Sequence, residues 1–347
     1  MLIYANPHHT LHDGRHEMFR GRLVPCHETP ARLDHVLAEL GRRPVGERRE
    51  PPPVPRAALE RVHAPRYLDF LQGAWDEWVA LDPANAALDA LPSTWPVRGF
   101  RHDVEPENFA ARLGLYSYDA GTPLTAGTWA AAEAGAACAV AAAHGVAAGA
   151  TRSAAALTRP PGHHAGADFF GGYCFLNNAA LAAQALRDQG AQKVAVVDVD
   201  YHHGNGTQSL FYDRADVLTV SIHGDPRTEY PFYLGHADER GEGEGFGHNL
   251  NLPLPAGTVF ADWRVALQQA LKRVTEHRAD ALVVALGVDT YEGDPISRFR
   301  LASADYLTIG RDLAAMRLPT VFTMEGGYAV EAMGVNLVNV LEGFEQG

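Results

Sequence analysis

The stretch VVDVDYHHGNGTQ, residues 196–208, continues a run of small apolar residues and then places two aspartates and two histidines close together. In an extended strand alternate side chains share a face, so Asp198, Asp200 and His202 are expected to point in one direction. Buried carboxylates repel each other unless a cation or protons lie between them. The stretch therefore predicts a buried strand whose end carries a metal site, and a hydrogen-bonded cap at a strand end is the simpler alternative.

Short apolar runs with the same character recur along the chain, each ended by polar or glycine-rich turns. They predict buried strands at 154–157, 194–199, 217–222, 281–286 and 320–324. Helical patterns lie between them, at 178–189, 261–277 and 304–316. Strands that alternate with helices predict an α/β fold of three layers, with a mostly parallel central sheet and helices on both faces.

Composition excludes several classes of protein. The net charge of -13 and the absence of a basic cluster argue against a nucleic-acid partner. The alanine-rich stretch 127–150 carries Glu133 and His144, so it predicts a buried helix and no membrane span. Three cysteines without CxxC spacing, and an N-terminus without a secretion signal, predict a cytoplasmic protein. We expect one domain, 1–347, with an insertion at about 82–127 that is too long for a passive connection.

A second carboxylate follows the predicted strand 281–286, where LGVDTYEGDP places Asp289 just past the strand end. Open α/β sheets build their sites at this edge. Asp200, His202 and Asp289 would be three protein ligands with a position left open for water and substrate, as in catalytic zinc sites. A two-metal hydrolase is the nearest competitor, but glycines and a tyrosine occupy the positions where further bridging carboxylates would be needed.

Two further loops carry polar groups. RPPGHHAGADFFGGYCFLNN (159–178) holds His163 and His164 inside a turn rich in proline and glycine, and either histidine could act as general base and acid. MEGGYAV (324–330) follows another predicted strand, and its glycines would let Tyr328 donate to a developing oxyanion. By itself, GGY is more typical of a turn with a packed ring.

Together, RPPGHHA, GGYCFLNN, DVDYHHGNGTQ, LGVDT and MEGGY resemble the motifs of the histone deacetylase superfamily, whose fold resembles that of arginase. Within the superfamily, the chain is most similar to the acetylpolyamine amidohydrolase group. The resemblance runs nearly end to end, through GRLVPCHETP, VHAPRYLDFL, GTWAAAEAG, SIHGDPRTEYPFYLG and GVNLVNVL. The combination of motifs is highly specific, whereas any one of them would be weak evidence.

The resemblance implies a role for each matching position. It makes Asp200, His202 and Asp289 the ligands of one catalytic Zn²⁺, and it makes His164 the general base and acid. His163 would be the charge-stabilising neighbour, oriented by Asp198. The remaining implied residues are Asn205 beside His164, Gly172, Tyr173 and Tyr230 around the substrate, and Asp198, Asp200, His202, Ser221 and Ile222 around a structural K⁺. Asn205 stands where many deacetylases have an aspartate, so it should raise the pKa of His164 less than a carboxylate would.

The implied function is zinc-dependent removal of acetyl groups from small N-acetylated amines, such as acetylputrescine or acetylcadaverine, by a homodimer. One departure bears on the substrate: Ala110 and Gly121 stand where the group has glutamates that receive the distant ammonium. Acidic residues nearby could substitute: Asp103, Glu105, Glu107 and Asp119. Two alternatives stay open: deacetylation of acetyl-lysine in proteins or peptides, and a sensor that binds acetylated ligands without catalysis.

Overall fold

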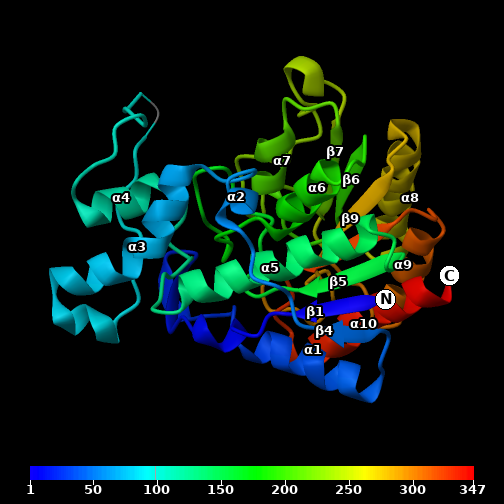
Figure 1. Cartoon of the computed structure of the whole chain (residues 1–347), viewed down its shortest axis with the longest axis horizontal. Coiled ribbons are helices and arrows are strands. Elements are labelled where there is room, and N and C mark those ends of the chain that lie inside the picture. Colours follow the sequence, from blue (N-terminus) through cyan, green and yellow to red (C-terminus); the bar gives the residue numbers. More distant parts are fainter. Residues whose placement is uncertain (98) are drawn as a thin grey trace.

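The computed structural model describes residues 1–97 and 99–347. Eight parallel strands form one central sheet in the order β4-β1-β5-β10-β9-β6-β7-β8 (Figure 1). Their bounds are β1 Leu2–Ala5, β4 Glu47–Arg49, β5 Ser153–Leu157, β6 Val194–Asp198, β7 Val217–Gly224, β8 Asn249–Leu254, β9 Ala281–Leu286 and β10 Thr320–Met324. A short antiparallel hairpin of β2 (His16–Phe19) and β3 (Arg22–Pro25) lies outside this sheet.

Helices cover both faces of the sheet because successive side chains of each buried strand point to opposite sides. On one face, Val196 and Val283 belong to an apolar cluster with residues of α3 (Pro65–Leu81), α5 (Thr128–Ala147) and α6 (Asn178–Asp188). On the other face, Val197 and Val284 belong to a cluster with four further helices. These are α1 (Ala31–Arg42), α8 (Phe260–His277), α9 (Asp305–Ala314) and α10 (Val330–Gln346). The predicted three-layer α/β architecture is confirmed.

The predicted strands and helices agree with the observed ones to within a residue or two at their ends. Three strands of the central sheet were not predicted, β1, β4 and β8, and neither was the hairpin of β2 and β3. β8 (NLNLPL) alternates apolar and polar residues at the edge of the sheet, and β4 (ERR) is fully exposed, so neither has the continuous apolar run of a central strand. β4 is held by pairing with β1 and not by burial of its own side chains, whereas the leucines of β8 pack against one apolar cluster.

The alanine-rich helix α5 packs against α6 and β5, as Figure 1 shows. By length and composition alone it could cross a membrane, but 67% of its most apolar window is buried inside the protein. The core helix of a globular fold passes the same test of length and hydropathy. The prediction of a buried helix at this position is confirmed.

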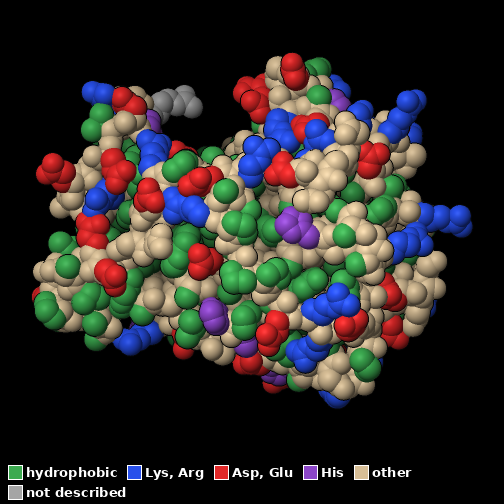
Figure 2. All heavy atoms as spheres, in the orientation of Figure 1, with side chains coloured by type: hydrophobic (Ala, Val, Ile, Leu, Met, Phe, Trp, Pro, Cys, Tyr) green, Lys and Arg blue, Asp and Glu red, His purple; other side chains and the backbone are tan. Residues whose placement is uncertain are grey.

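The predicted insertion, 82–127, contains little regular structure in its described part: η2 (Pro83–Ala87) and α4 (Phe109–Leu115). Phe109 stacks on Trp78 of α3, and Figure 1 shows this pair of helices at the end of the molecule away from α8 and α9. On the face drawn in Figure 2, acidic and basic side chains are intermixed and form no broad basic patch.

Candidate active site

The polar motifs of the sequence converge because the strands that carry them are parallel neighbours. β5, β10, β9 and β6 lie side by side, and their carboxyl ends face the same edge of the sheet. The loops that follow these strands carry His163 and His164, Tyr328, Asp289, and Asp200 with His202. Segments far apart in the sequence therefore meet at one edge, where open α/β folds place their sites.

Asp200, His202 and Asp289 form a compact group of possible metal ligands, with ligand atoms that all lie within 4.8 Å of one another. His202 Nδ1 lies 3.0 Å from Asp289 Oδ2 and 3.4 Å from Asp200 Oδ1. Backbone N–H groups hold both carboxylates in place: Gly326 donates to Asp200 Oδ2 at 2.7 Å, and Tyr201 donates to Asp289 Oδ1 at 2.8 Å. The three side chains predicted to meet at the ends of the strands do lie together.

The electrostatics of this group fit a bound cation. Burial and the neighbouring Asp200 raise the pKa of Asp289 to about 7, which is the response of a carboxylate buried beside another carboxylate. Burial opposes protonation of His202, yet Asp200 and Asp289 outweigh it and raise the His202 pKa to about 9. One nitrogen and two carboxylates suit a divalent ion such as Zn²⁺. The positive charge of the ion would stabilise the two carboxylates in place of a proton on His202 or Asp289.

The adjacent histidines have different environments. His163 Nδ1 lies 2.9 Å from Asp198 Oδ2, and Asp198 with Asp200 raises the His163 pKa to about 10 although burial opposes this. His164 Nδ1 lies 2.7 Å from Asn205 Oδ1, and burial followed by repulsion from His163 lowers the His164 pKa well below its usual value. His163 is therefore suited to carry a charge, and neutral His164 is suited to accept a proton.

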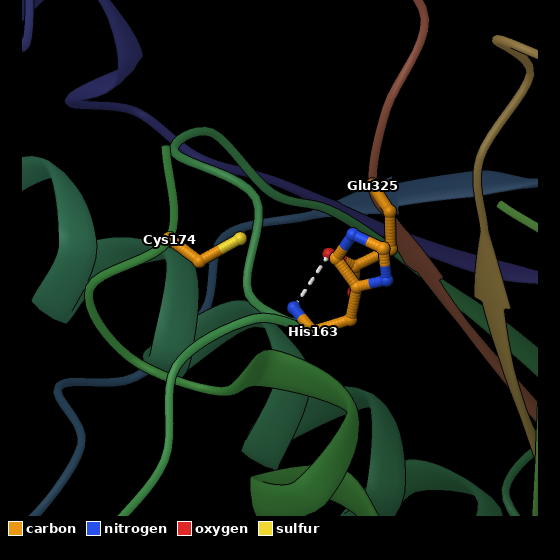
Figure 3. Close-up of side chains that lie close together, drawn as sticks. All are labelled: His163, Cys174 and Glu325. Atoms are coloured by element: carbon orange, nitrogen blue, oxygen red, sulfur yellow. Dashed lines mark hydrogen bonds between the residues drawn. The ribbon is translucent and has the colours of Figure 1, made fainter. Parts of the chain in front are cut away.

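A second group of possible ligands consists of His163, Cys174 and Glu325, which lie close together (Figure 3). Glu325 Oε2 accepts hydrogen bonds from the backbone N–H of Gly162 at 2.6 Å and of His163 at 3.0 Å. Glu325 Oε1 accepts from the Thr323 hydroxyl at 3.0 Å, and the Cys174 thiol donates to the Gly172 carbonyl. Because these polar atoms are already hydrogen-bonded, we interpret the group as the anchor of the histidine loop and not as a metal site.

Two glycines bring Tyr328 next to the carboxylates. A Cβ atom at Gly326 would stand 2.5 Å from Asp200 Oδ2, and Gly327 has a φ of +137°, which favours glycine. The Gly327 carbonyl accepts from Arg32 Nε at 2.7 Å, and the Arg32 guanidinium lies 4.8 Å from the Tyr328 ring centre. The two glycines of the GGY motif therefore let this loop pass close to the carboxylates. Tyr328 itself is 8% exposed.

A cavity of about 340 Å³ joins these groups to the surface, and His164, His202 and Tyr328 all line it. Its other walls include the predicted substrate contacts Gly172, Tyr173 and Tyr230. A second cavity, of about 380 Å³, lies beside the insertion and contains none of the predicted site residues. The smaller cavity is the one that reaches the chemistry, so we assign it as the substrate channel.

The acidic residues that line the channel differ in their hydrogen-bond and ion-pair partners. Asp119 accepts from the backbone N–H of Gly172 at 2.7 Å and from the Tyr230 hydroxyl at 2.6 Å, so it braces the walls. Glu229 pairs with Arg298. Glu17, from β2, accepts from the Tyr173 hydroxyl at 2.8 Å and from the backbone N–H of His27 at 3.1 Å. None of the ion pairs within residues 1–97 and 99–347 involves Glu17. Burial raises the Glu17 pKa to about 7.

Sequence reasoning missed Glu17 because HEMF has no motif and β2 lies outside the main sheet. The suggested substitutes Asp103, Glu105 and Glu107 are absent from the described lining of the channel. Instead, Asp103 pairs with Arg101 and Glu105 accepts from the Tyr116 hydroxyl. Asp119 does line the channel, but its carboxylate holds protein groups, as described above.

The residues expected around K⁺ lie at the ends of two paired strands, with Asp198 of β6 opposite Ser221 of β7 and Ile222 next in sequence. The Ser221 hydroxyl lies 2.7 Å from His223 Nδ1 and 3.2 Å from His203 Nδ1. The strand register places Asp198 and Ser221 side by side, and the potassium site stays a prediction.

Comparison with known proteins agrees with this geometry. A family model described as histone deacetylase domain matches residues 26–344. The chain is 53% identical over 345 residues to acetylpolyamine amidohydrolase 2 of Pseudomonas aeruginosa, and 44% identical over 343 residues to the acetylpolyamine amidohydrolase of Mycoplana ramosa, with 99% of each chain covered in both cases. A crystal structure of acetylpolyamine aminohydrolase from Burkholderia pseudomallei superposes with a TM-score of 0.93 at 40% identity, covering 99% of this chain and 98% of that one.

The fold, the gathered motifs and full-length similarity lead to the same assignment. The family model spans nearly all of the chain, so no large part of the sequence falls outside the match. The chain belongs to the histone deacetylase family, within its acetylpolyamine amidohydrolase group, and is a hydrolase that acts on amides.

Proposed function

We propose that the protein is a zinc-dependent amidohydrolase that removes acetyl groups from small N-acetylated amines, releasing acetate and a free amine. The observation that carries this proposal is the lining of one channel by neutral His164, by Tyr328 and by His202 of the metal-ligand group. The names of the relatives, acetylpolyamine amidohydrolases, support the class of substrate.

In the proposed mechanism, a divalent ion held by Asp200, His202 and Asp289 would polarise the acetyl carbonyl and activate a water molecule. His164 takes the proton of the attacking water and later gives it to the leaving amine. The Tyr328 hydroxyl donates a hydrogen bond to the oxyanion. His163, kept protonated by Asp198, stabilises negative charge nearby.

The channel residues position the substrate. The Gly172 carbonyl is the proposed acceptor for the amide N–H, and the Tyr173 and Tyr230 rings flank an alkyl chain. We propose that Glu17 receives the distant ammonium, because it lines the channel and, within residues 1–97 and 99–347, pairs with no arginine. Its oxygens accept from the Tyr173 hydroxyl and from the backbone N–H of His27, which lies outside the described lining of the channel. Glu17 would then replace the insertion glutamates that are missing at positions 110 and 121.

The remaining assignments are also proposals. We propose that the chain is one catalytic domain, 1–347, located in the cytoplasm, with a structural K⁺ held by Asp198, Asp200, His202, Ser221 and Ile222. We further propose a homodimer through the insertion 82–127, which carries exposed apolar side chains. These are Leu88, Val97, Phe100 and Val104, each more than half exposed.

A substrate panel tests the proposal. Purified full-length protein, reconstituted with one equivalent of Zn²⁺, is incubated with N-acetylputrescine, N-acetylcadaverine, N8-acetylspermidine and an acetyl-lysine peptide, and released acetate is measured. We expect higher kcat/KM for the acetylated amines than for the peptide. Preference for the peptide would favour a protein deacetylase, and binding of the amines without any acetate release would favour a sensor.

A further inference from the structure

We propose that Asp294, in the loop between β9 and α9, is a positioning residue that fixes Tyr328 for the proposed deacetylation and joins it to the channel wall at Ile296. This inference rests on the proposed function and adds a residue to it. This loop also carries Asp289, and Asp294 contacts the loop that follows β10 and carries Tyr328. Asp294 is 8% exposed, so its carboxylate acts within the protein.

The carboxylate divides its two oxygens between two segments. Asp294 Oδ2 accepts from the backbone N–H of Tyr328 at 2.7 Å and of Ala329 at 3.2 Å. Asp294 Oδ1 accepts from the backbone N–H of Ile296 at 3.0 Å. Ile296 and Tyr328 both line the substrate channel. One side chain therefore sets the distance between the tyrosine and a wall of the channel.

Tyr328 needs such a contact because the two residues before it are glycines. Glycine leaves the backbone free to adopt many conformations, so the sequence Gly326-Gly327 does not by itself hold the ring in one place. Arg32 binds the Gly327 carbonyl on one side of the following peptide bond. Asp294 binds the N–H of Tyr328 on the other side of the same bond. The two contacts together fix the peptide plane from which the Tyr328 side chain extends.

The position of the ring matters for rate more than for substrate binding. A hydroxyl that stabilises an oxyanion must lie within hydrogen-bond distance of the place where the charge develops. Misplacement of a reacting group by about 1 Å can cost roughly 100-fold in rate. Loss of the Asp294 contact should therefore lower kcat and leave KM nearly unchanged.

The test uses Asp294→Ser in the full-length, zinc-reconstituted protein. A serine hydroxyl can still accept from the Ile296 N–H two residues along, as serine does in local turns, but it offers no second oxygen to Tyr328. We expect kcat for N-acetylputrescine to fall about 10- to 100-fold, with KM within about threefold. When Asp294→Ser is added to Tyr328→Phe, kcat should fall by less than about threefold below that of Tyr328→Phe alone. The hydroxyl that Asp294 positions is already gone in that background.

Asp280→Ser is the matched control. Asp280 stands at the opposite end of β9, and its Oδ2 also accepts two successive backbone N–H groups, those of Gln192 at 2.7 Å and Lys193 at 2.8 Å. The Asp280→Ser variant loses the same kind of contact far from the channel. The kcat of this variant should therefore stay within about twofold of the wild type. Zinc content is measured for both variants, and should stay at one equivalent.

Hydrogen exchange gives a second readout that does not depend on activity. The backbone amides of the peptide that contains Tyr328 and Ala329 should exchange faster in Asp294→Ser than in the wild type. In Asp280→Ser they should exchange at the wild-type rate. If Asp294→Ser does not fold, Asp294→Asn replaces it. Its amide has one accepting oxygen in place of two, so exchange should rise either at Ile296 or at Tyr328 and Ala329, and kcat should fall if it rises at Tyr328; faster exchange at Tyr328 with unchanged kcat would overturn the inference.

Four results would overturn the inference: kcat within twofold of the wild type, an equal loss in the Tyr328→Phe background, loss of zinc from the variant, or unchanged exchange at Tyr328. An inactive wild type would refute the proposed function instead, and the exchange experiment would still decide whether Asp294 holds the tyrosine.

Discussion

Replacing Glu17 with glutamine should reduce the preference of the enzyme for cationic substrates. Glutamine keeps nearly the same shape, and its one accepting oxygen can retain the hydrogen bond from the Tyr173 hydroxyl. The longer contact with the His27 N–H, at the other carboxylate oxygen, is lost. The substitution also removes the negative charge. A charge-assisted hydrogen bond contributes about 1.5–3 kcal/mol, so kcat/KM for N-acetylputrescine should fall roughly 10- to 100-fold.

The wild-type enzyme should show the same effect as a function of pH. Burial raises the Glu17 pKa to about 7, so the carboxylate that attracts an ammonium is mostly charged at pH 8 and mostly protonated at pH 6. With this pKa the charged fraction falls roughly tenfold between pH 8 and pH 6. The attraction is therefore lost as the pH falls through the pKa.

A neutral substrate separates this effect from the titration of the catalytic groups. N-pentylacetamide has the length of N-acetylputrescine, with a methyl group in place of the ammonium. The ratio of kcat/KM for N-acetylputrescine to that for N-pentylacetamide should fall roughly tenfold between pH 8 and pH 6 in the wild type, and should be flat in Glu17→Gln. A ratio that does not change with pH in the wild type, or that is unchanged by the substitution, would refute this role of Glu17.

Three further predictions follow from the site. His164→Ala should lower kcat by about 100-fold or more, because the general base and acid is lost; kcat within tenfold of the wild type would contradict its role. Tyr328→Phe should lower kcat by about 100-fold while KM changes little. Initial rates of acetate release, measured over a range of substrate concentrations, give both constants. Asp119→Asn should chiefly raise KM, because it weakens the brace between Gly172 and Tyr230; a change confined to kcat would show that the brace acts elsewhere.

Much of the fold could be predicted because the central strands are short, apolar and fully buried. The predicted bounds of β9 and β10 agree with the observed ones, since their apolar runs end where the polar loops begin. The edge strand β4 could not be found in this way: its three residues are all exposed, and it is held by parallel pairing with β1. Pairing of this kind depends on neighbours that the local sequence does not reveal.

The candidate site shows a similar division. The side chains that carry charge at strand ends, such as Asp200 and Asp289, were predictable because parallel strands bring their carboxyl ends together. Arg32 and Glu17 were not, since each acts from a segment with no chemical motif of its own. Their positions follow from tertiary contacts: Arg32 reaches the glycine loop from α1, and Glu17 reaches the channel from β2. Asp294 lies in the quoted stretch LGVDTYEGDP, but the sequence does not reveal that its carboxylate binds the backbone of Tyr328.

The central claim is that Asp200, His202 and Asp289 hold one divalent ion on which deacetylation depends. The most direct measurement is a titration of metal-free protein with Zn²⁺, following acetate release from N-acetylputrescine, beside the same titration of Asp289→Ala. We predict that wild-type activity rises linearly and stops at one equivalent, and that Asp289→Ala neither retains zinc on gel filtration nor gains activity. Full activity in the metal-free protein, or zinc binding by Asp289→Ala equal to that of the wild type, would contradict the claim.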